Sequence, residues 1–465
     1  MPNQLSISTR PLRVAIIGSG PSGFYAAESL LSVNRNVNVT LFDRLPAPFG
    51  LVRYGVAPDH AKIKNVIKIY EKISQQPGFS FLGNVNVGAD IAVKELQIFF
   101  DAIIFAYGAQ TDRKLGIPGE NLQGCHSATE FVAWYNGHPH YRHLQFDLSR
   151  ESAIVVGQGN VAVDVCRMLC KSVEELKNTD IAAHALTALS ESKIKEVHMI
   201  GRRGPAQAAF TPVEIREFAE LKSFTTIIHP HDLELNEASI QELADPKNAA
   251  KKKNYEILKK IAGQEPGGTK KFFIHFFKSP LKLVAHRLPL GEMNHVEKII
   301  LEKNHLSGEA NHQSPQGTGE SEELNCGIFF SSVGYRGLAI PQIPFDDKKG
   351  IISNREGRVV TSLGEICLGL YATGWIKRGA SGVIGTNKPD ADETVKHLCD
   401  DIENLIPCQE PNQESFLDFL MKKNIRFVTF ADWKKIDEAE IARGQKVGKP
   451  REKFVSVEEM LAVIK

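Results

Sequence analysis

Apolar and polar positions follow the same order twice along this chain. Residues 13–31, RVAIIGSGPSGFYAAESLL, are a β-branched run, a glycine-rich turn and then a helical pattern of apolar residues. Residues 153–170, AIVVGQGNVAVDVCRMLC, repeat that order. Each segment therefore predicts a strand, a turn and a helix, which is the opening of a βαβ unit.

Four further apolar runs are typical of buried parallel strands: residues 38–43, 101–108, 196–201 and 369–374. With the two repeated segments they predict an α/β fold with two Rossmann-like dinucleotide-binding domains. Two polar stretches are expected to carry no chemistry. Residues 242–271 predict an exposed, lysine-rich helix, and residues 312–323 predict a surface hairpin or a mobile loop.

The length and composition are those of an ordinary globular protein. A chain of 465 residues is long enough for two or three domains, each with its own core. The formal net charge of +1 gives no general attraction to nucleic acid, so no nucleic-acid partner is expected. No apolar run approaches the roughly 18 to 20 residues that cross a bilayer, so no membrane span is expected.

The seven cysteines are scattered and have no CxxC spacing. This pattern favours a reducing compartment and argues against a zinc or iron–sulfur site, so no metal ligands are predicted. Cys166 and Cys170 stand four residues apart on the second predicted helix and are interpreted as buried core residues.

The first glycine-rich turn has the spacing of a dinucleotide-binding site. Gly18, Gly20 and Gly23 follow a strand and open a helix, so the backbone can approach a pyrophosphate at the positive end of that helix. Asp43 ends the next strand, 20 residues after Gly23. A carboxylate at that position can accept a hydrogen bond from a ribose hydroxyl.

The second turn contains Gly157, Gly159 and Ala162, the variant with alanine in the third position. Its next strand ends without an acid and runs into Arg202 and Arg203. Paired guanidinium groups at a strand end suit a 2′-phosphate, so NADP(H) is expected there rather than NAD(H).

Two such folds in one chain imply two dinucleotides. In the usual arrangement one fold holds a flavin firmly and the other binds a diffusing nicotinamide nucleotide. A hydride then passes between the two rings. That step depends on how the rings are positioned more than on a side-chain acid or base.

Eight blocks, in order along the chain, resemble the adrenodoxin reductase family of ferredoxin–NADP reductases. They are VAIIGSGPSGFYAAESLL (14–31), PFGLVRYGVAPDH (48–60), AYGAQTDRKLGIPGE (106–120), FVAWYNG (131–137), VVGQGNVAVDVCR (155–167), IGRRGPAQAAFT (200–211), GWIKRGASGVIGTNK (374–388) and FADWKKIDEAEIARGQKVGKPREK (430–453). The resemblance and the order of the blocks imply an NADP-binding domain, residues 108–332, inserted into a discontinuous FAD-binding domain of residues 1–107 and 333–465.

The resemblance also implies the residues of both sites. Around FAD, besides the first turn and Asp43, it places Ser22, Leu51, Val87, Trp375, Gly382, Val383 and Ile384. For NADP it implies the turn Gly157, Gln158, Gly159, Asn160 and Val161 at the pyrophosphate, Arg202 and Arg203 at the 2′-phosphate, and Glu214 at another part of the nucleotide. Gly382 would touch both cofactors, because a residue without Cβ lets the two rings meet.

Three residues, His60, Trp375 and Gly382, are expected to act in catalysis on the strength of this resemblance. We hypothesise that His60, near the flavin in the family, handles protons; the alternative is a histidine hydrogen-bonded to backbone. Trp375 would border the flavin, with a pure packing role as the alternative. Asp43 stands where the family usually has glutamate, so its bond to the ribose is expected to be longer or water-mediated.

The predicted function is an enzyme that passes electrons from NADPH through FAD to a ferredoxin- or adrenodoxin-like iron–sulfur protein. The alternatives are an electron-entry subunit of a larger flavoenzyme complex and a dinucleotide-binding regulator without turnover. A disulfide reductase is disfavoured because the chain has neither a CxxC nor a CxxxxC pair.

A local charge excess predicts where an acidic ferredoxin docks. Residues 191–290 contain 17 lysines and arginines against 12 acids, which would give the NADP domain a basic face that salt screens. The lysine run 251–253 is interpreted as solubilising charge. A monomer is expected, in the bacterial cytoplasm or alternatively in the mitochondrial matrix. The better docking candidates are Lys193, Lys195, Arg202, Arg203 and Arg216.

Overall fold

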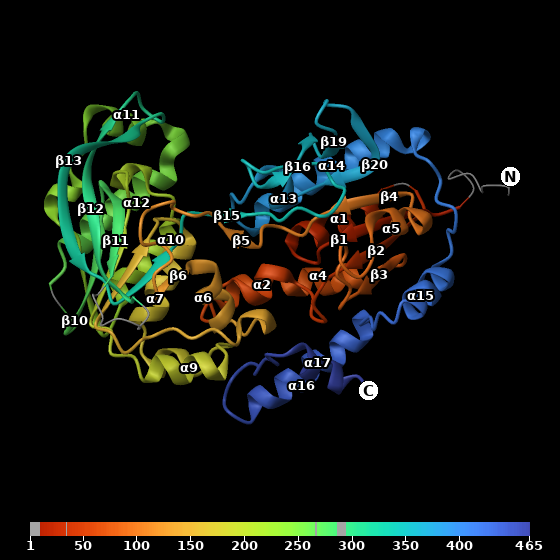
Figure 1. Ribbon diagram of the computed structural model, residues 1–465, viewed down its shortest axis with the longest axis horizontal. Coiled ribbons are helices and arrows are strands. Elements are labelled where there is room, and N and C mark those ends of the chain that lie inside the picture. The colour runs from red at the N-terminus through yellow and green to blue at the C-terminus, as the bar shows by residue number, and fades with distance from the viewer. Residues whose placement is uncertain (1–9, 34, 266, 286–293) are drawn as a thin grey trace. The chain divides into compact units, whose positions relative to one another are not determined.

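The computed structural model describes residues 10–33, 35–265, 267–285 and 294–465 (Figure 1). The chain divides into two compact units. Unit 1 contains the residues up to Thr111, the short segment His138–His140 and the residues Gly334–Lys465. Unit 2 contains Asp112–Gly137 and Tyr141–Val333. The segment 138–140 thus groups with unit 1, although it lies inside the stretch 108–332 that was expected to form one domain.

Unit 1 is built on a seven-stranded sheet in the order β18-β19-β20-β4-β1-β2-β3. Its parallel strands are β1 (Leu12–Ile17), β2 (Val37–Phe42), β3 (Phe79–Leu82), β4 (Ala102–Phe105) and β20 (Ile366–Ala372). Two short strands, β18 (Asn354–Arg355) and β19 (Arg358–Val360), extend it in antiparallel fashion. Because β20 pairs with β4, the last part of the chain completes the sheet that the first part begins.

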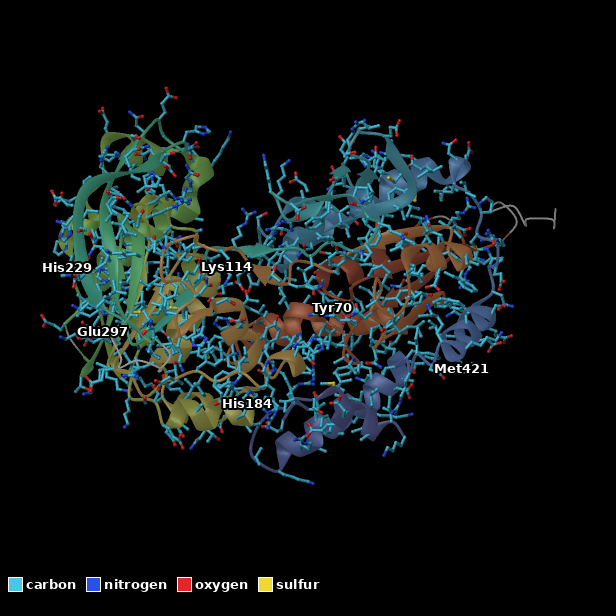
Figure 2. The ribbon with its side chains drawn as sticks, viewed as in Figure 1. Tyr70, Lys114, His184, His229, Glu297 and Met421 are labelled. Atoms are coloured by element: carbon cyan, nitrogen blue, oxygen red, sulfur yellow. The ribbon has the colours of Figure 1, made fainter. Side chains whose placement is uncertain are left out.

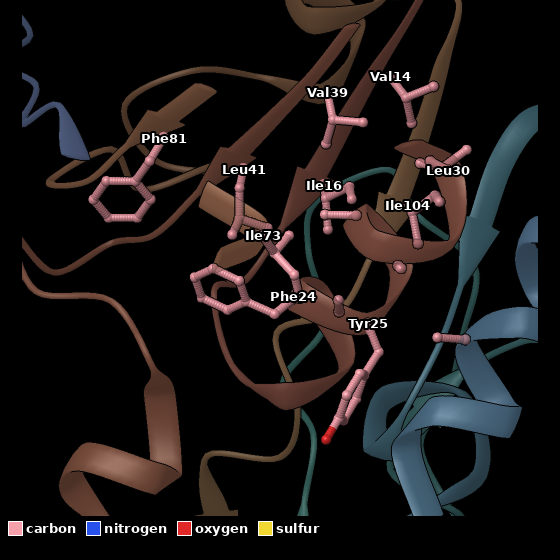
Figure 3. Close-up of a cluster of buried hydrophobic side chains, with 14 of the residues drawn as sticks. Val14, Ile16, Phe24, Tyr25, Leu30, Val39, Leu41, Ile73, Phe81 and Ile104 are labelled. Atoms are coloured by element: carbon pink, nitrogen blue, oxygen red, sulfur yellow. The ribbon is translucent and has the colours of Figure 1, made fainter. Parts of the chain in front are cut away.

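Both faces of this sheet are buried. Val14 and Ile16 of β1 belong to one hydrophobic cluster, while their neighbours Ala15 and Ile17 point to the other face and belong to a second cluster. Figure 3 shows the first cluster, in which side chains of β1 lie beside Phe24 of α1 (Pro21–Ser32). Two-sided burial explains why the strands are continuous apolar runs in the sequence.

Aromatic stacking fastens a second helix to this cluster. Tyr70, labelled in Figure 2, comes from α4 (Ile67–Ser74), and its ring stacks on Phe24 with ring centroids 4.7 Å apart. An offset pair of this kind adds about 0.5 to 1.5 kcal/mol beyond the area it buries.

Unit 2 has a six-stranded parallel sheet in the order β6-β14-β7-β8-β10-β9. A separate antiparallel sheet of β11 (Lys278–Ala285), β12 (Val296–Ser307) and β13 (Ser314–Asn325) shares one hydrophobic cluster with it. The parallel strands are β6 (Cys125–Ser127), β7 (Ser152–Val156), β8 (Glu196–Ile200), β9 (Phe224–Ile227), β10 (Lys270–His275) and β14 (Ile328–Ser331).

The main predicted elements are confirmed. The four apolar runs correspond to β2, β8, β4 and β20, and the two glycine-rich turns open α1 and α7 (Asn160–Cys170). The lysine-rich stretch contains α12 (Ala249–Ala262), and residues 312–323 fall largely in β13, the exposed second strand of the hairpin β12–β13.

All seven cysteines are free. Cys166 and Cys170 are 0% and 2% exposed, so the prediction that they are core residues is confirmed. Within the described residues, no helix combines the length and the apolar character that crossing a membrane requires.

Candidate functional site

The first glycine-rich turn joins β1 to α1 in unit 1. Gly18 has a φ of 112°, and a Cβ on it would lie 2.5 Å from Tyr107 Cα. A Cβ on Gly23 would lie 2.0 Å from the carbonyl oxygen of Gly18. Gly20, in contrast, caps α1 and faces open space, since its nearest neighbour would be 4.0 Å away. The turn therefore has two glycines that pack and one that leaves room for a pyrophosphate at the helix N-terminus.

Asp43 directly follows β2 and is held by that turn. Its Oδ2 accepts hydrogen bonds from the N–H of Ser19 at 3.2 Å and from Ser19 Oγ at 2.5 Å, and its Oδ1 accepts from the N–H of Leu45 at 2.9 Å. Burial raises the pKa of the Asp43 carboxyl, and these hydrogen bonds oppose the rise. Ser19 is a site residue that sequence reasoning missed, because it occupies a variable position of the glycine motif.

Residues 374–387 meet the first turn from the far end of the chain. A Cβ on Gly374 would lie 1.9 Å from Ser22 Oγ, so this contact requires glycine. Ser22 Oγ donates to Asn387 Oδ1 at 3.0 Å, across 365 positions of sequence. The structure thus brings Ser22 together with the block that contains Trp375 and Gly382. Asn387, which is 7% exposed, was missed as a site residue because its hydrogen bond to Ser22 joins residues far apart in the sequence.

The loop from Gly374 to Gly382 is closed by its own hydrogen bonds. Trp375 opens α13 (Trp375–Arg378), and its Nε1 donates to the carbonyl oxygen of Ser381 at 3.0 Å. Arg378 donates to the same oxygen at 2.5 Å and to Asn387 Oδ1 at 3.0 Å. The loop therefore has a fixed shape, and Arg378 is a second residue whose role the sequence alone did not reveal.

Gly382 lies at the end of this loop with a φ of 79°. A Cβ there would approach Thr386 Oγ1 to 2.4 Å, so both the backbone conformation and the space favour glycine. Val383 is exposed, and Ile384 opens the 3₁₀ turn Ile384–Thr386 and packs against the first hydrophobic cluster.

The remaining predicted residues of unit 1 are spread over three segments. Leu51 is an exposed residue of α2 (Gly50–Tyr54), and Val87 is buried and bridges to Ile91. His60 is half-buried and directly precedes α3 (Ala61–Lys64). The roles of these residues toward FAD remain predictions.

The second glycine-rich turn joins β7 to α7 in unit 2 and repeats the design of the first. A Cβ on Gly157 would lie 2.2 Å from the carbonyl oxygen of Ser332, whereas a Cβ on Gly159 would meet nothing within 4 Å. Gln158 Nε2 donates to the carbonyl oxygen of His275 at 2.8 Å, and Asn160 Oδ1 accepts from the N–H of Thr211 at 2.8 Å. Two side chains of the turn are therefore fixed by hydrogen bonds to other segments of unit 2. Val161 is half-buried, and Ala162 is fully buried.

Arg202 and Arg203 follow β8, and both side chains are exposed between buried glycines. Among the described residues, neither guanidinium group has a hydrogen bond or an ion pair. Although its side chain is exposed, partial desolvation of the guanidinium group and the charge of Arg202 lower the pKa of Arg203, and the charge of Glu242 opposes this. Two adjacent cations without a carboxylate partner are a site for an anion with several oxygens, such as a phosphate monoester. Glu214 lies on the next helix, α10 (Pro212–Arg216), and is 6% exposed.

Comparison with known proteins identifies the family. The family model described as pyridine nucleotide-disulphide oxidoreductase matches residues 12–222. The mitochondrial NADPH:adrenodoxin oxidoreductase of Arabidopsis thaliana is 43% identical over 470 residues, which cover 98% of this chain and 96% of that protein. The NADPH-ferredoxin reductase FprA of Mycobacterium tuberculosis is 42% identical over 467 residues, which cover 98% and 99%. The chain belongs to the adrenodoxin reductase family.

A solved structure supports the same membership. The structure of Mycobacterium tuberculosis FprA in complex with NADPH matches with a TM-score of 0.88 at 41% identity, covering 98% of this chain and 100% of that chain. The predicted resemblance to the adrenodoxin reductase family and the predicted α/β fold class are both confirmed.

The residues of this chain, a member of the adrenodoxin reductase family, fit two dinucleotides. Each unit has a helix N-terminus with an open glycine, Gly20 or Gly159, for a pyrophosphate. The carboxylate in unit 1 suits a ribose, and the two unpaired guanidinium groups in unit 2 suit a 2′-phosphate.

Proposed function

We propose that this chain is a flavoprotein reductase that passes electrons from NADPH through FAD to a ferredoxin-type iron–sulfur protein. The observation that carries the proposal is that one chain has two glycine-rich turns with unlike partners. The first is completed by Asp43 and the second by Arg202 and Arg203. Relatives named NADPH:adrenodoxin oxidoreductase and NADPH-ferredoxin reductase, similar over nearly the whole chain, support it.

In this proposal the chain's own residues bind and orient the two dinucleotides. The first turn and the N-terminus of α1 would hold the FAD pyrophosphate, and Asp43 would accept from its ribose. The second turn and α7 would hold the NADP pyrophosphate, with Arg202 and Arg203 on the 2′-phosphate. Bound FAD supplies the chemistry, because it can accept a hydride from NADPH and release single electrons. The hydrogen-bonded loop 374–382 would fix the place of Trp375 and Gly382 beside the reacting rings.

His60 is assigned a proton-handling role in this scheme. A histidine can change its charge near neutral pH, so turnover that depends on it should change between about pH 6 and pH 8. NADPH-to-ferredoxin turnover that keeps its pH profile in H60Q would exclude this role.

The partner, the oligomeric state and the compartment are parts of the same proposal. We assign an acidic ferredoxin as the electron acceptor, a monomer as the active form, and the bacterial cytoplasm as the compartment, with the mitochondrial matrix as the alternative. The bacterial and mitochondrial relatives support both compartments. Sedimentation of the purified protein would test the monomer.

The flavin colour tests the central proposal. The purified protein should be yellow, NADPH should bleach it without oxygen, and an oxidised acidic ferredoxin should then restore the colour. NADH at the same concentration should bleach it far more slowly. A protein that takes up no FAD, or whose FAD neither nucleotide reduces, would support the alternative of a dinucleotide-binding regulator without turnover. A reduced protein that no ferredoxin reoxidises would support the electron-entry subunit.

A further inference from the structure

The chain makes a tight corner in unit 2 between β10, which ends at His275, and β11, which begins at Lys278. Phe277, inside this corner, has a φ of 55°. A bulky side chain adopts the left-handed region only where its surroundings impose it, and such residues gather at functional sites. No motif marked this segment in the sequence.

The corner holds the strand end that carries the two arginines. The N–H of Gly201 donates to the carbonyl oxygen of His275 at 3.0 Å, and the N–H of Lys278 donates back to the carbonyl oxygen of Gly201 at 3.0 Å. The N–H of Phe277 donates to the carbonyl oxygen of Arg203 at 3.1 Å. The N–H of Phe277 thus lies under the carbonyl oxygen of Arg203, and the left-handed φ turns the chain from β10 into β11.

Asn304 of β12 supplies a hydrogen-bond donor for Arg202, which lies between Gly201 and Arg203 in the sequence. Its Nδ2 donates to the carbonyl oxygen of Arg202 at 2.9 Å, and its N–H donates to the carbonyl oxygen of Phe277 at 2.7 Å. Gln158 also donates to the carbonyl oxygen of His275. One corner is therefore bonded to both parts of the proposed NADP site, the glycine-rich turn and the arginine pair.

The aromatic ring of Phe277 supports the same strand end from the side. A Cβ on Gly204, the residue after the arginine pair, would lie 2.6 Å from Phe277 Cζ. The ring therefore packs directly on the backbone of Gly204, which explains why glycine follows the two arginines.

A buried ammonium group fixes the side chains beneath the corner. Lys278 is 8% exposed, and its Nζ donates to Glu322 Oε1 at 2.5 Å and to His275 Nδ1 at 3.2 Å. Since an ammonium group can only donate, the proton of His275 is on Nε2, which donates to His198 Nδ1 at 3.0 Å. Burial and the nearby ammonium lower the pKa of His275 to about 2 and of His198 to about 4. Both imidazole rings are therefore neutral, and Lys278 is the cation in this series of hydrogen-bonded side chains.

We propose that the His275–Lys278 corner, with Asn304, determines the preference for NADPH over NADH, and that Lys278 is its positioning residue. The inference rests on the proposed function, which assigns Arg202 and Arg203 to the 2′-phosphate. The backbone of Arg202 and Arg203 sets where their Cα–Cβ bonds point, and the corner fixes that backbone. Without the ammonium, a partly buried carboxylate and a ring nitrogen lose their donor, so the corner must rearrange.

K278M tests the inference, because methionine fills similar space without the charge. The KM for NADPH should rise about tenfold and the KM for NADH, which shares only the glycine-rich turn, much less, while kcat and the FAD content stay unchanged. In titrations, 2′,5′-ADP should bind about tenfold more weakly, and 5′-ADP, which lacks the 2′-phosphate, should lose much less affinity. K278R should recover most of the preference. K298M is the matched control, because the exposed Lys298–Glu323 pair, 3.1 Å apart, lies in the same antiparallel sheet.

Four outcomes bear on the inference in different ways. An equal loss for NADPH and NADH, or no loss for either, overturns it, since the first indicates general disruption and the second no role. If K278M does not fold, N304A tests the inference through the hydrogen bond to Arg202. An equal loss for both nucleotides, or no loss for either, then overturns the inference in the same way. A wild-type protein without preference for NADPH would instead overturn the assignment of Arg202 and Arg203, and with it the proposed function.

Discussion

Asp43 uses both of its carboxylate oxygens within the protein. Oδ2 accepts from Ser19 and Oδ1 from Leu45, so the orientation of the group is set by the turn and by the end of β2. A ribose hydroxyl bound to Asp43, as proposed, would meet an acceptor whose position is already fixed, which would lower the entropic cost of binding.

Replacing this acid with its amide should loosen FAD. In D43N an NH2 donor replaces one oxygen, so it must face either the donors on Ser19 or the N–H of Leu45. Loss of a charge-assisted hydrogen bond costs about 1.5 kcal/mol, so FAD should bind about tenfold more weakly. Flavin released during ultrafiltration measures this directly. D43E is the control, because it keeps the charge and restores the residue usual in the family. FAD retention by D43N equal to that of the wild type would remove Asp43 from the site.

Gly382 and Gly379 offer a matched pair of substitutions in one loop. Both have positive φ values, 79° and 86°, so alanine costs about 1 to 3 kcal/mol of backbone strain at either position. Only the Cβ at Gly382 would clash, with Thr386 Oγ1 at 2.4 Å, whereas the Cβ at Gly379 would meet nothing within 4 Å. We therefore expect G382A to slow the reduction of bound FAD by NADPH about a hundredfold in stopped-flow measurements.

G379A should slow the same step much less, because it introduces backbone strain without a clash between Cβ and Thr386. Similar rates for the two variants would mean that backbone strain, and not the space beside Gly382, accounts for the effect. Gly382 would then lose its predicted place between the two rings.

The sequence predicted those site residues whose role depends on local geometry. The glycines of both turns, Asp43 and the arginine pair follow from their spacing after a strand. Lys278 and Asn387 could not be predicted in this way, because their roles come from partners far along the chain. Lys278 is 44 positions from Glu322, and Asn387 is 365 positions from Ser22.

At the scale of elements, one carboxylate joins three segments of unit 1. Asp101, immediately before β4, accepts from Arg10 through both oxygens at 2.7 Å, from the N–H of Arg13 at 2.9 Å and from the N–H of Cys408 at 2.9 Å. It thereby fastens the start of β1 and the segment that follows α14 (Asn387–Asp401) to β4. Burial raises the pKa of Asp101, but these hydrogen bonds outweigh it and the pKa is lowered overall.

The lowered pKa gives the stability of unit 1 a defined pH dependence. A carboxyl whose pKa is lower in the folded state stabilises the protein above its ordinary value of 3.8, and this contribution is lost as pH falls through the folded-state value. D101N should therefore lower the free energy of unfolding by about 3 kcal/mol at neutral pH. The difference from the wild type should shrink as the pH falls below about 4.

Urea denaturation at several pH values measures this difference. D418N serves as the control, because Asp418 is exposed on α15 (Gln413–Lys422). A D101N deficit that stays constant from neutral to strongly acid pH would show that it arises from packing and not from the charge.

The elements that the sequence predicted well are those buried on two faces. Their apolar runs are long and continuous, as in β2 and β8. The antiparallel sheet β11–β13 gave a weaker signal, because β13 is almost wholly polar and exposed. The sequence did not indicate that residues 138–140 belong to unit 1. They join it through side-chain packing, with the ring centroid of His138 4.9 Å from that of Tyr54.

At the scale of the whole molecule, the distribution of charge bears on the partner. Lys193, Arg202, Arg203 and Arg216 are exposed in unit 2, whereas Lys195 is paired with Glu151 and is the weaker candidate. Of the stretch 191–290, residues 266 and 286–290 lie outside the described residues, and Arg287 is the one counted charge among them.

Reduction of an acidic ferredoxin should therefore depend on salt. Raising the ionic strength from about 20 to about 300 mM should slow it about tenfold, because salt screens the attraction between exposed charges. Reduction of an uncharged quinone such as menadione, a small acceptor that needs no docking face, should change far less. K193E should slow ferredoxin reduction at low salt, whereas K94E, an exposed charge reversal in unit 1, should not. Equal slowing of both acceptors by salt would argue against a docking face in unit 2.

The pairing of β4 with β20 has a consequence for how the protein is made. These neighbouring strands are separated by about 260 residues, most of which form unit 2. A ribosome adds about 5 to 20 residues per second, so the edge of β4 waits roughly 13 to 52 s for its partner. Unit 2 contains a hydrophobic cluster of its own and can fold during that interval. The nascent chain must meanwhile carry an unfinished sheet whose open edge invites association with other chains. Slow synthesis between residues 106 and 365 should therefore lower the yield of folded protein more than equal slowing after residue 372.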